Sequence, residues 1–457
     1  MHKKNENFKK KTAAAVMAAA LCFGGAALAQ DKPKPAAAPA AKPAPATPRA
    51  QPLGGWIVEL MKTDRRVAAS SEDYLGAVQR ERVALGEWFP TLKVTAWTGK
   101  ERVDNPTGAD TRMHASERDV TLTQLVADFG KTSARVAQAG YAAEQAKAGL
   151  AIARQGLILD AASAYVNLHR AAVVYEFATQ SEANLAEQLR LEQARQRAGG
   201  GVSTDVLQVQ AQYAGATARR ARAQSVVQLA AARFVNVFGR QPDALGSLVR
   251  PAPAEKLPES LEAAQSAAVE SNPAVKNASL TVESAREGVR AARAESFFPK
   301  IEAIYDHKSK DDVLGTAGHK TEALLKGQLT WSFNLGFTGV NSVRASDHTA
   351  AAARYRLTDA EKNAREQASI GWQNLAVARQ TVAAYGRQVS ATRDFLDLAR
   401  KERQLGKRSL IDVLNGETVL LNAQSDLVSA ELDELLAGFG LLQSVGRLDE
   451  AAVSRVR

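Results

Sequence analysis

The chain has 457 residues, of which 45% are hydrophobic and only 6% aromatic, so it can bury a substantial core in which alanine does much of the apolar packing. Its formal net charge of +10 is mild for this length. The densest basic cluster, Arg219, Arg220 and Arg222, would point to different faces of a helix. This favours a solvated surface and argues against nucleic-acid binding.

No motif in the sequence indicates catalytic chemistry. The six histidines are scattered, and none forms the His-Glu-x-x-His pairing that binds zinc. The glycine runs near 200 and 406 lack the spacing of a phosphate-binding loop and are better explained as turns. We therefore expect no catalytic residue, no metal and no cofactor.

Residues 1–29 have the pattern of a secretory signal peptide. Several lysines precede an apolar run over 12–27, and Ala27-Leu28-Ala29 supplies the small residues of a cleavage site. The single cysteine, Cys22, lies inside this segment, and Leu21 before it is not the small residue that a lipidation site would have. We therefore predict export, removal of the segment and a mature chain without thiols.

Residues 30–54 consist largely of alanine, proline and lysine, which predicts a flexible tether because this composition cannot bury a core. Beyond it, no proline falls between 107 and 241 or after 299. A proline inside a helix costs about 3 kcal/mol. These two tracts therefore allow very long helices.

The first repeat, residues 55–250, predicts two strands followed by two long helices. Apolar and polar residues alternate at about 91–103 and 117–129, as in strands with one polar face. Helical spacing then covers 131–197, a length of roughly 100 Å at about 1.5 Å per residue. A glycine turn leads into a return helix over 203–238, which predicts a long antiparallel hairpin. The turn glycines are Gly199, Gly200 and Gly201.

The second repeat, residues 251–447, predicts the same order and is followed by a C-terminal tail at 448–457. Its expected elements are strands at about 300–307 and 322–334, a long helix over 337–405, a turn at Gly406 and a return helix over 409–445. The recurring motifs are Phe89-Pro90 with Phe298-Pro299, Asp128-Phe129-Gly130 with Asn334-Leu335-Gly336, and Gly239-Arg240 with Gly446-Arg447. A duplication of this length indicates architecture rather than a single chemical site.

Two explanations remain for the four strands. They can be ordinary soluble hairpins, or they can cross a membrane, since an exported chain without a long apolar helix can span a bilayer only as a closed set of strands. The smallest transmembrane barrels need about eight strands. If these strands lie in a membrane, the chain must therefore oligomerise.

The hairpin turns and their flanking helices resemble the TolC-like outer membrane factor family. The resemblance extends over residues 55–447 and is most specific in Arg195–Tyr213 and Gly406–Asp433. It implies a mainly α fold with a β-barrel part, in which a homotrimer builds a 12-stranded outer-membrane barrel and a long periplasmic α-helical tunnel. The segment around Pro242–Pro258 and the C-terminal tail would form an equatorial belt.

The same resemblance implies the exit duct of a tripartite efflux pump or type I secretion system. Its partners would be a periplasmic adaptor (a membrane fusion protein), an inner-membrane transporter and outer membrane lipid, and it would open at its periplasmic tip when engaged. The sequence from Asp412 to Glu417 resembles members that serve type I secretion more than members dedicated to drug efflux. The alternative is a soluble periplasmic coiled-coil adaptor or scaffold. Such a protein usually carries one hairpin between β-rich domains, not two hairpins that each follow a strand pair.

The resemblance assigns five residues near the turns to pore constriction or gating. Arg408 matches an arginine that holds the closed state, Asp412 matches a cation-selective acidic ring, and Asp205 matches the aspartate of the other hairpin. Asn415 stands at a second acidic-ring position, and Arg403 stands where some members have a gate tyrosine. Because only the second repeat has Arg408, the second hairpin is expected to do the gating.

The two aspartates also have a purely structural interpretation. Ser203 or Thr204 can cap the first return helix, and Ser409 can cap the second. Asp205 and Asp412 would then lie in first turns, where the helix dipole favours a carboxylate without any pore.

Overall fold

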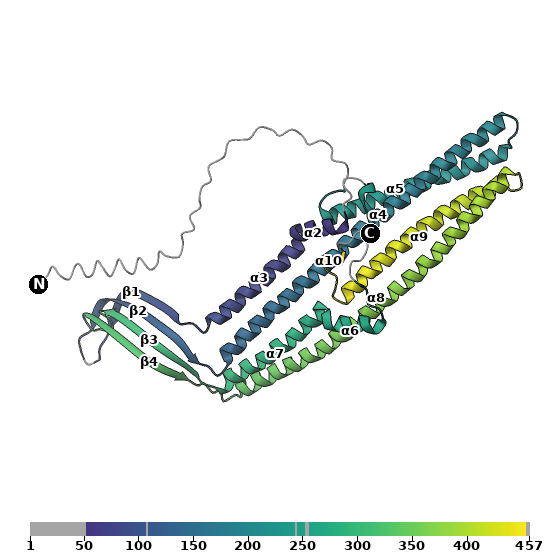
Figure 1. Ribbon diagram of the computed structural model, residues 1–457. Coiled ribbons are helices and arrows are strands. Elements are labelled where there is room, and N and C mark those ends of the chain that lie inside the picture. Colours follow the sequence, from purple (N-terminus) through teal and green to yellow (C-terminus); the bar gives the residue numbers. More distant parts are fainter. Residues whose placement is uncertain (1–51, 107, 243–244, 252–255, 454–457) are drawn as a thin grey trace. The chain divides into compact units, whose positions relative to one another are not determined.

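The computed structural model describes residues 52–106, 108–242, 245–251 and 256–453. Within these ranges the chain forms long helices and one four-stranded antiparallel sheet (Figure 1). The expected signal peptide, nearly all of the expected tether and the end of the tail lie outside the described residues. None of the helices in the described part combines the length and the hydropathy of a membrane span.

Two helices that the sequence analysis did not predict, α2 (Leu53–Thr63) and α3 (Arg65–Gly86), precede the sheet. Their counterparts in the second repeat are α6 (Leu261–Ser271) and α7 (Pro273–Phe297). The tether expected to reach residue 54 ends earlier, because Leu53 already belongs to α2 and is buried. Apolar contact with the core therefore outweighs the local composition at this boundary.

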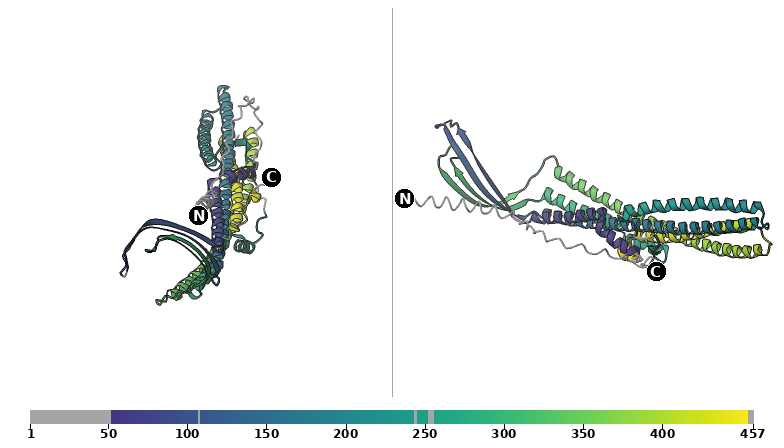
Figure 2. Two further views of the ribbon diagram at one scale, coloured as in Figure 1. Left: turned by 90° about the vertical axis from the view of Figure 1, so that its left-hand side faces the viewer. Right: turned by 90° about the horizontal axis from the view of Figure 1, so that it is seen from above.

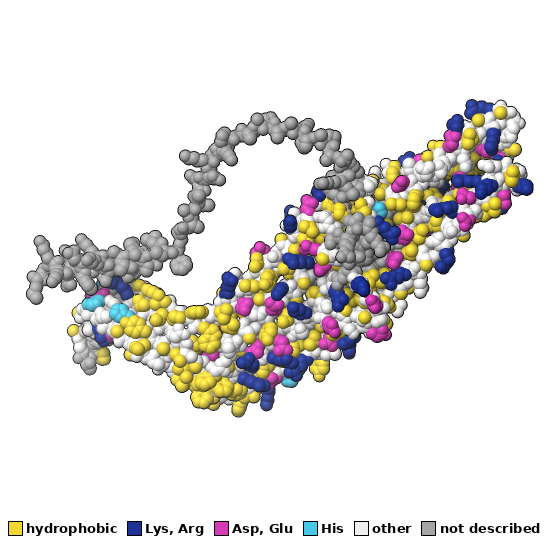
Figure 3. All heavy atoms as spheres, in the orientation of Figure 1, with side chains coloured by type: hydrophobic (Ala, Val, Ile, Leu, Met, Phe, Trp, Pro, Cys, Tyr) yellow, Lys and Arg dark blue, Asp and Glu magenta, His cyan; other side chains and the backbone are white. Residues whose placement is uncertain are grey.

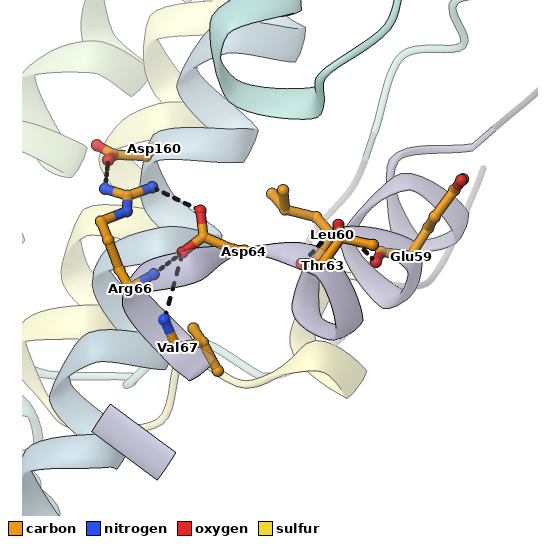
Figure 4. Close-up of polar contacts among 7 residues, drawn as sticks. All are labelled: Glu59, Leu60, Thr63, Asp64, Arg66, Val67 and Asp160. Carbon is orange, nitrogen blue, oxygen red and sulfur yellow. Dashed lines mark hydrogen bonds and ion pairs between the residues drawn. The ribbon is translucent and has the colours of Figure 1, made fainter. Parts of the chain in front are cut away.

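The corner between α2 and α3 is fixed by Asp64 (Figure 4). Its carboxylate caps α3 by accepting hydrogen bonds from the backbone N–H groups of Arg66 (2.8 Å) and Val67 (3.3 Å). The Arg66 guanidinium lies 2.9 Å from a carboxylate oxygen of Asp160 on α4. Hydrogen bonds to Asp160 and Asp64 raise the pKa of Arg66. The corner thus attaches the first helices to the long helix.

The sheet joins the two repeats. Its strands are β1 (Thr91–Val103), β2 (Thr111–Ala127), β3 (Lys300–Asp311) and β4 (His319–Thr330), paired in that order. Strands β2 and β3 come from different repeats and pair from Ser116 with Asp311 to Ala127 with Ile301. Figure 2 shows the four strands curving together as one sheet.

The sequence misplaced boundaries of three strands. Strand β2 begins at 111 and not at 117, β3 runs to 311 and not to 307, and β4 covers 319–330 and not 322–334. Backbone pairing continues outward through charged residues, where apolar alternation is absent. At the other end β2 stops before Phe129 and Gly130, which both adopt a positive φ.

The long hairpins consist of α4 (Lys131–Arg197) with α5 (Ser203–Phe238), and of α8 (Thr338–Gln404) with α9 (Leu410–Ser444). Helices α8 and α9 are each one residue shorter at both ends than the expected 337–405 and 409–445. In each repeat the long helix packs along its return helix. Helices α4 and α7 also pack together, so the repeats contact each other beyond the sheet.

The main core lies where α2, α4, α5 and α9 meet. Trp56 packs edge-on against Phe234 (ring centroids 5.1 Å apart), and Arg240 lies 4.0 Å above the Trp56 ring. Buried Tyr165 donates a hydrogen bond to the carbonyl oxygen of Val249 (3.0 Å), and burial raises the pKa of its hydroxyl. A short 3-10 helix, η1 (Leu245–Ser247), and the final helix α10 (Glu450–Val453) lie in the segments expected to form the belt.

Candidate functional site

The first hairpin turns through a glycine run at 198–202. Gly199 has a φ of +76°, a conformation that other residues adopt only with strain. A Cβ atom on Gly201 would lie 2.7 Å from the backbone nitrogen of Gln196. Glycine is therefore required at both positions, for conformational reasons at the first and for space at the second.

The second hairpin turns at Gly406, which has a φ of +74°. The Ser409 side chain then caps α9 by accepting a hydrogen bond from the backbone N–H of Asp412 (3.3 Å). The cap expected from Ser203 or Thr204 in the first hairpin is wrong. Helix α5 starts after Val202 without a side-chain cap, since Ser203 is already helical and its Oγ accepts a hydrogen bond from Gln196 Nε2 (3.0 Å).

Arg403 connects the two hairpins. Its Nη2 lies 3.4 Å from Asp205 Oδ2 and 3.9 Å from Glu192 Oε1. Glu192 is buried, with its side chain 8% exposed, and also receives a hydrogen bond from Arg195 Nη1 (2.8 Å). The structure therefore brings together two of the expected residues, Arg403 of the second hairpin and Asp205 of the first.

Arg408 has a different environment from Arg403. Its Nε lies 2.7 Å from Glu402 Oε2, and its guanidinium lies 5.2 Å from the centre of the Phe395 ring. Both contacts are with α8, so Arg408 bonds within its own hairpin. The described ion pairs that join the two hairpins near their turns come from Arg403.

Asp412 and Asn415 line an open groove on the second hairpin, away from the Arg403 group. The groove has a volume of about 340 Å³ and is otherwise lined mainly by Phe395, Gly416 and Val419. Asp412 is exposed, and no described cation forms an ion pair with its carboxylate. The structure thus divides the five expected residues into Arg403 with Asp205, Arg408 with Glu402, and Asp412 with Asn415.

A second polar bridge between the hairpins was not predicted from the sequence. Glu417 Oε1 lies 2.9 Å from Arg400 Nη2 and accepts a hydrogen bond from Gln188 Nε2 (3.0 Å). Opposite charges on either side of the second turn were a visible signal for the first of these contacts. The contact with Gln188 had no such signal, because it depends on how the hairpins pack. An apolar cluster of Leu185, Val209, Ala216, Leu410 and Leu414 lies between the hairpins.

The polar contacts near the two hairpin turns differ in strength. Its ion pairs are mostly partly exposed, so each contributes roughly 0–1 kcal/mol. Buried Glu192 is the exception, because a carboxylate without its cations would remain desolvated. In the described ranges, no group of three or more His, Cys, Asp or Glu residues is placed to hold a metal ion.

Comparison with known proteins places this architecture in a family. The model of the outer membrane efflux protein family matches residues 64–240 and 264–447. The chain is 28% identical over 397 residues to the outer membrane efflux protein BepC of Brucella suis, covering 87% of this chain and 85% of BepC. It is 26% identical over 403 residues to the outer membrane protein TolC of Vibrio cholerae, covering 85% of this chain and 89% of TolC.

Solved structures show the same fold. The outer membrane protein VceC of Vibrio cholerae superposes with a TM-score of 0.72 at 19% identity, over 86% of this chain and 96% of VceC. The fold is therefore that of outer membrane channels with an α-helical and a β part. The chain belongs to the outer membrane efflux protein family, whose members are exit ducts through the outer membrane.

Proposed function

We propose that the chain forms the outer-membrane exit duct of a tripartite export system, as a homotrimer whose periplasmic tip opens when its partners bind. The observation that carries this proposal is a sheet with one apolar face, one charged face and two unpaired edge strands. The duct would conduct its cargo without catalysing a reaction. The two faces, the edges and the tip each support one part of the proposal.

The apolar face of the sheet fits contact with lipid. Leu92 pairs with Leu122, Leu122 with Tyr305, and Tyr305 with Leu325, so these side chains form one continuous row. All four are exposed, from 39% for Leu122 to 76% for Leu325. Figure 3 shows hydrophobic side chains gathered over this region, whereas charged side chains cover the helices. Exposed aromatic residues surround the junction of sheet and helices, as in the girdles of membrane barrels; they are Trp88, Phe89, Phe298, Trp331, Phe333 and Phe337.

The polar face of the sheet fits a water-filled lumen. Lys310 Nζ lies 3.1 Å from Glu322 Oε2 and 3.9 Å from Glu117 Oε1, and Lys308 Nζ lies 3.9 Å from Asp119 Oδ2. These residues lie on the face opposite the apolar row, because side chains alternate along a strand. Charged groups of this number would be costly against lipid and are ordinary beside water.

The edge strands β1 and β4 are unpaired in the described chain, and an unpaired edge cannot persist in lipid because its backbone groups would lack hydrogen bonds. The pairing within the sheet indicates how these two edges could pair between subunits. Thr91 pairs with Thr123, and Lys300 pairs with Thr330. These equivalent pairs align β1 with β3 and β2 with β4.

The pairing of β2 with β3 then predicts how β4 pairs with β1 of a neighbouring subunit. Thr123 of β2 pairs with Ile304 of β3, four residues after Lys300. The equivalent contact pairs Thr330 of β4 with Thr95 of β1 in a neighbouring subunit. Thr95→Cys combined with Thr330→Cys should therefore form disulfide-linked oligomers, whereas a chain that remains a soluble monomer would reject the membrane assignment.

The helical tip supports a gate. Arg403, Asp205 and Glu192 hold the two hairpins of one subunit together, so an adaptor or inner-membrane transporter that separates them would widen the tunnel. Asp412, with Asn415 beside it in the groove, would contribute one carboxylate per subunit to a polar ring. Arg408 would stiffen the second turn through Glu402.

Membrane fractionation with and without heating in detergent tests the function most directly. A heat-modifiable oligomer in the outer-membrane fraction is expected. Recovery entirely in the soluble periplasmic fraction would favour the alternative, a coiled-coil adaptor or scaffold. Co-purification of an inner-membrane partner would then decide between a drug efflux transporter and a type I secretion transporter. From the sequence Asp412–Glu417 we infer a type I secretion transporter.

A further inference from the structure

The apolar face of the sheet changes character toward the far end of the strands. Beyond the rows of Leu92 and Val94, the side chains on this face become basic. We define the basic band as Lys100, Arg102, Arg112, His114 and Arg118, which share this face by the strand register and are all exposed.

Basic side chains oppose one another directly within the basic band. Arg102 pairs with Arg112 across β1 and β2, and Lys100 pairs with His114 in the same way. Like charges directly opposite on neighbouring strands, such as those of Arg102 and Arg112, destabilise a sheet. An anion bound between them would remove this repulsion.

The acidic groups on this face neutralise only part of the band. Asp104 lies 2.7 Å from Arg102, and Asp311 lies 2.7 Å from His319 Nδ1. In the described part of the chain, no hydrogen bond or ion pair reaches the charged ends of Lys100, Arg112 and Arg118, although Arg118 also interacts electrostatically with Asp311.

The height of the band above the helices matches a headgroup layer. The apolar face runs along β4 from Ala323 to Leu329 and continues past the end of the strand to the exposed Trp331 and Phe333. The ten residues from Ala323 to Phe333 span at most roughly 34 Å. A tilt of about 40° reduces this to about 25 Å, the usual height of the apolar band of an outer-membrane barrel. Arg118 lies in the next row outward, opposite Ser309 and Thr321 across the sheet. The band therefore begins where the acyl chains would end.

We propose that the basic band binds the phosphate groups of lipid headgroups in the outer leaflet. The inference rests on the proposed membrane orientation of the sheet, with the helices on the periplasmic side. Arginine suits this ligand because its planar guanidinium donates two parallel hydrogen bonds to phosphate. Basic clusters beside a membrane surface also attract anionic headgroups over several ångströms.

The test uses the full chain in phosphatidylcholine nanodiscs with and without diphosphoryl lipid A. Native mass spectrometry counts the lipid A molecules retained per chain after detergent extraction. In the variant Lys100→Gln, Arg112→Gln, Arg118→Gln, we expect the lipid A affinity to fall roughly tenfold or more. The matched control removes three lysines from the polar face, Lys93→Gln, Lys320→Gln and Lys326→Gln, and should retain lipid A as the unmodified chain does.

Equal retention in the basic-band variant and the unmodified chain would overturn the inference, and so would an equal loss in the control. If the variant does not assemble, the unmodified chain decides by itself, because phosphate binding by exposed cations must weaken as salt rises. Retention that is independent of salt would also reject the proposal. Failure of the unmodified chain to enter nanodiscs would instead reject the proposed membrane function.

Discussion

The two hairpin tips differ although their helices have nearly the same lengths and order. The first turn is a glycine run, its return helix has no side-chain cap, and it presents the carboxylates of Asp205 and Glu192. The second turn is capped by Ser409, is braced by Arg408 on Glu402, and presents Arg403 to the first hairpin. At Arg403 the first hairpin therefore supplies the acceptors and the second the donor, whereas at Glu417 the first hairpin donates through Gln188. Two hairpins of similar geometry thus carry different charges near their turns.

The largest expected difference between the repeats concerns the glycines that end their return helices. Gly239 and Gly446 both have a positive φ, near +75°. A Cβ atom on Gly446 would lie 2.4 Å from the carbonyl oxygen of Ser271, whereas one on Gly239 would meet nothing within 4 Å. Gly446→Ala should therefore cost about 3 kcal/mol or more, and Gly239→Ala only about 1 kcal/mol. Thermal unfolding followed by circular dichroism would compare them, and equal costs would contradict the close contact at Gly446.

The next effect concerns the bridge between the tips. Arg403→Ala removes a cation from Asp205 and from buried Glu192, so it should increase single-channel conductance in planar bilayers and lower stability by about 1 kcal/mol. Arg190→Ala is the matched control, because among the described residues Arg190 forms an ion pair only with Glu187 of its own helix. An unchanged conductance of assembled Arg403→Ala channels would show that the bridge does not hold the tip closed.

The helix caps predict a smaller difference. Ser409→Ala removes the cap of α9 and should cost about 1 kcal/mol, whereas Ser203→Ala removes no cap and should cost only a few tenths. Chemical denaturation of both variants measures the difference. Similar losses would mean that the second turn does not depend on its cap.

The smallest expected difference is a response to acid. Burial and the nearby Arg250 lower the pKa of His169 below its usual value of 6.5. The folded state therefore resists the proton that the unfolded state takes up, so stability should fall as the pH drops below about 6.5. Counted along α4 and α8, which both have 67 residues, the equivalent position in the second repeat is Ala376, which has no titratable side chain. His169→Leu should reduce this acid sensitivity in pH-dependent melting, and an unchanged pH profile would exclude His169 as its source.

The sequence was a good guide to the hairpins and a partial guide to the site. Helical spacing without proline predicted helices of the observed length, because these are local properties of the backbone. Asp205 and Arg403 were both expected near the tip, but their pairing and the burial of Glu192 were not. These depend on the packing of two hairpins about 200 residues apart in the chain.

By itself, the amino-acid sequence determined the repeat, the long helices, the positions of the turns and the alternation of the strands, since each follows from the chemistry of neighbouring residues. Tertiary structure alone decided that β2 pairs with β3, that Leu53 joins the core and that Arg403, not Arg408, connects the hairpins. Contacts between distant segments are set by the summed packing of whole helices and strands, and no local pattern contains that sum.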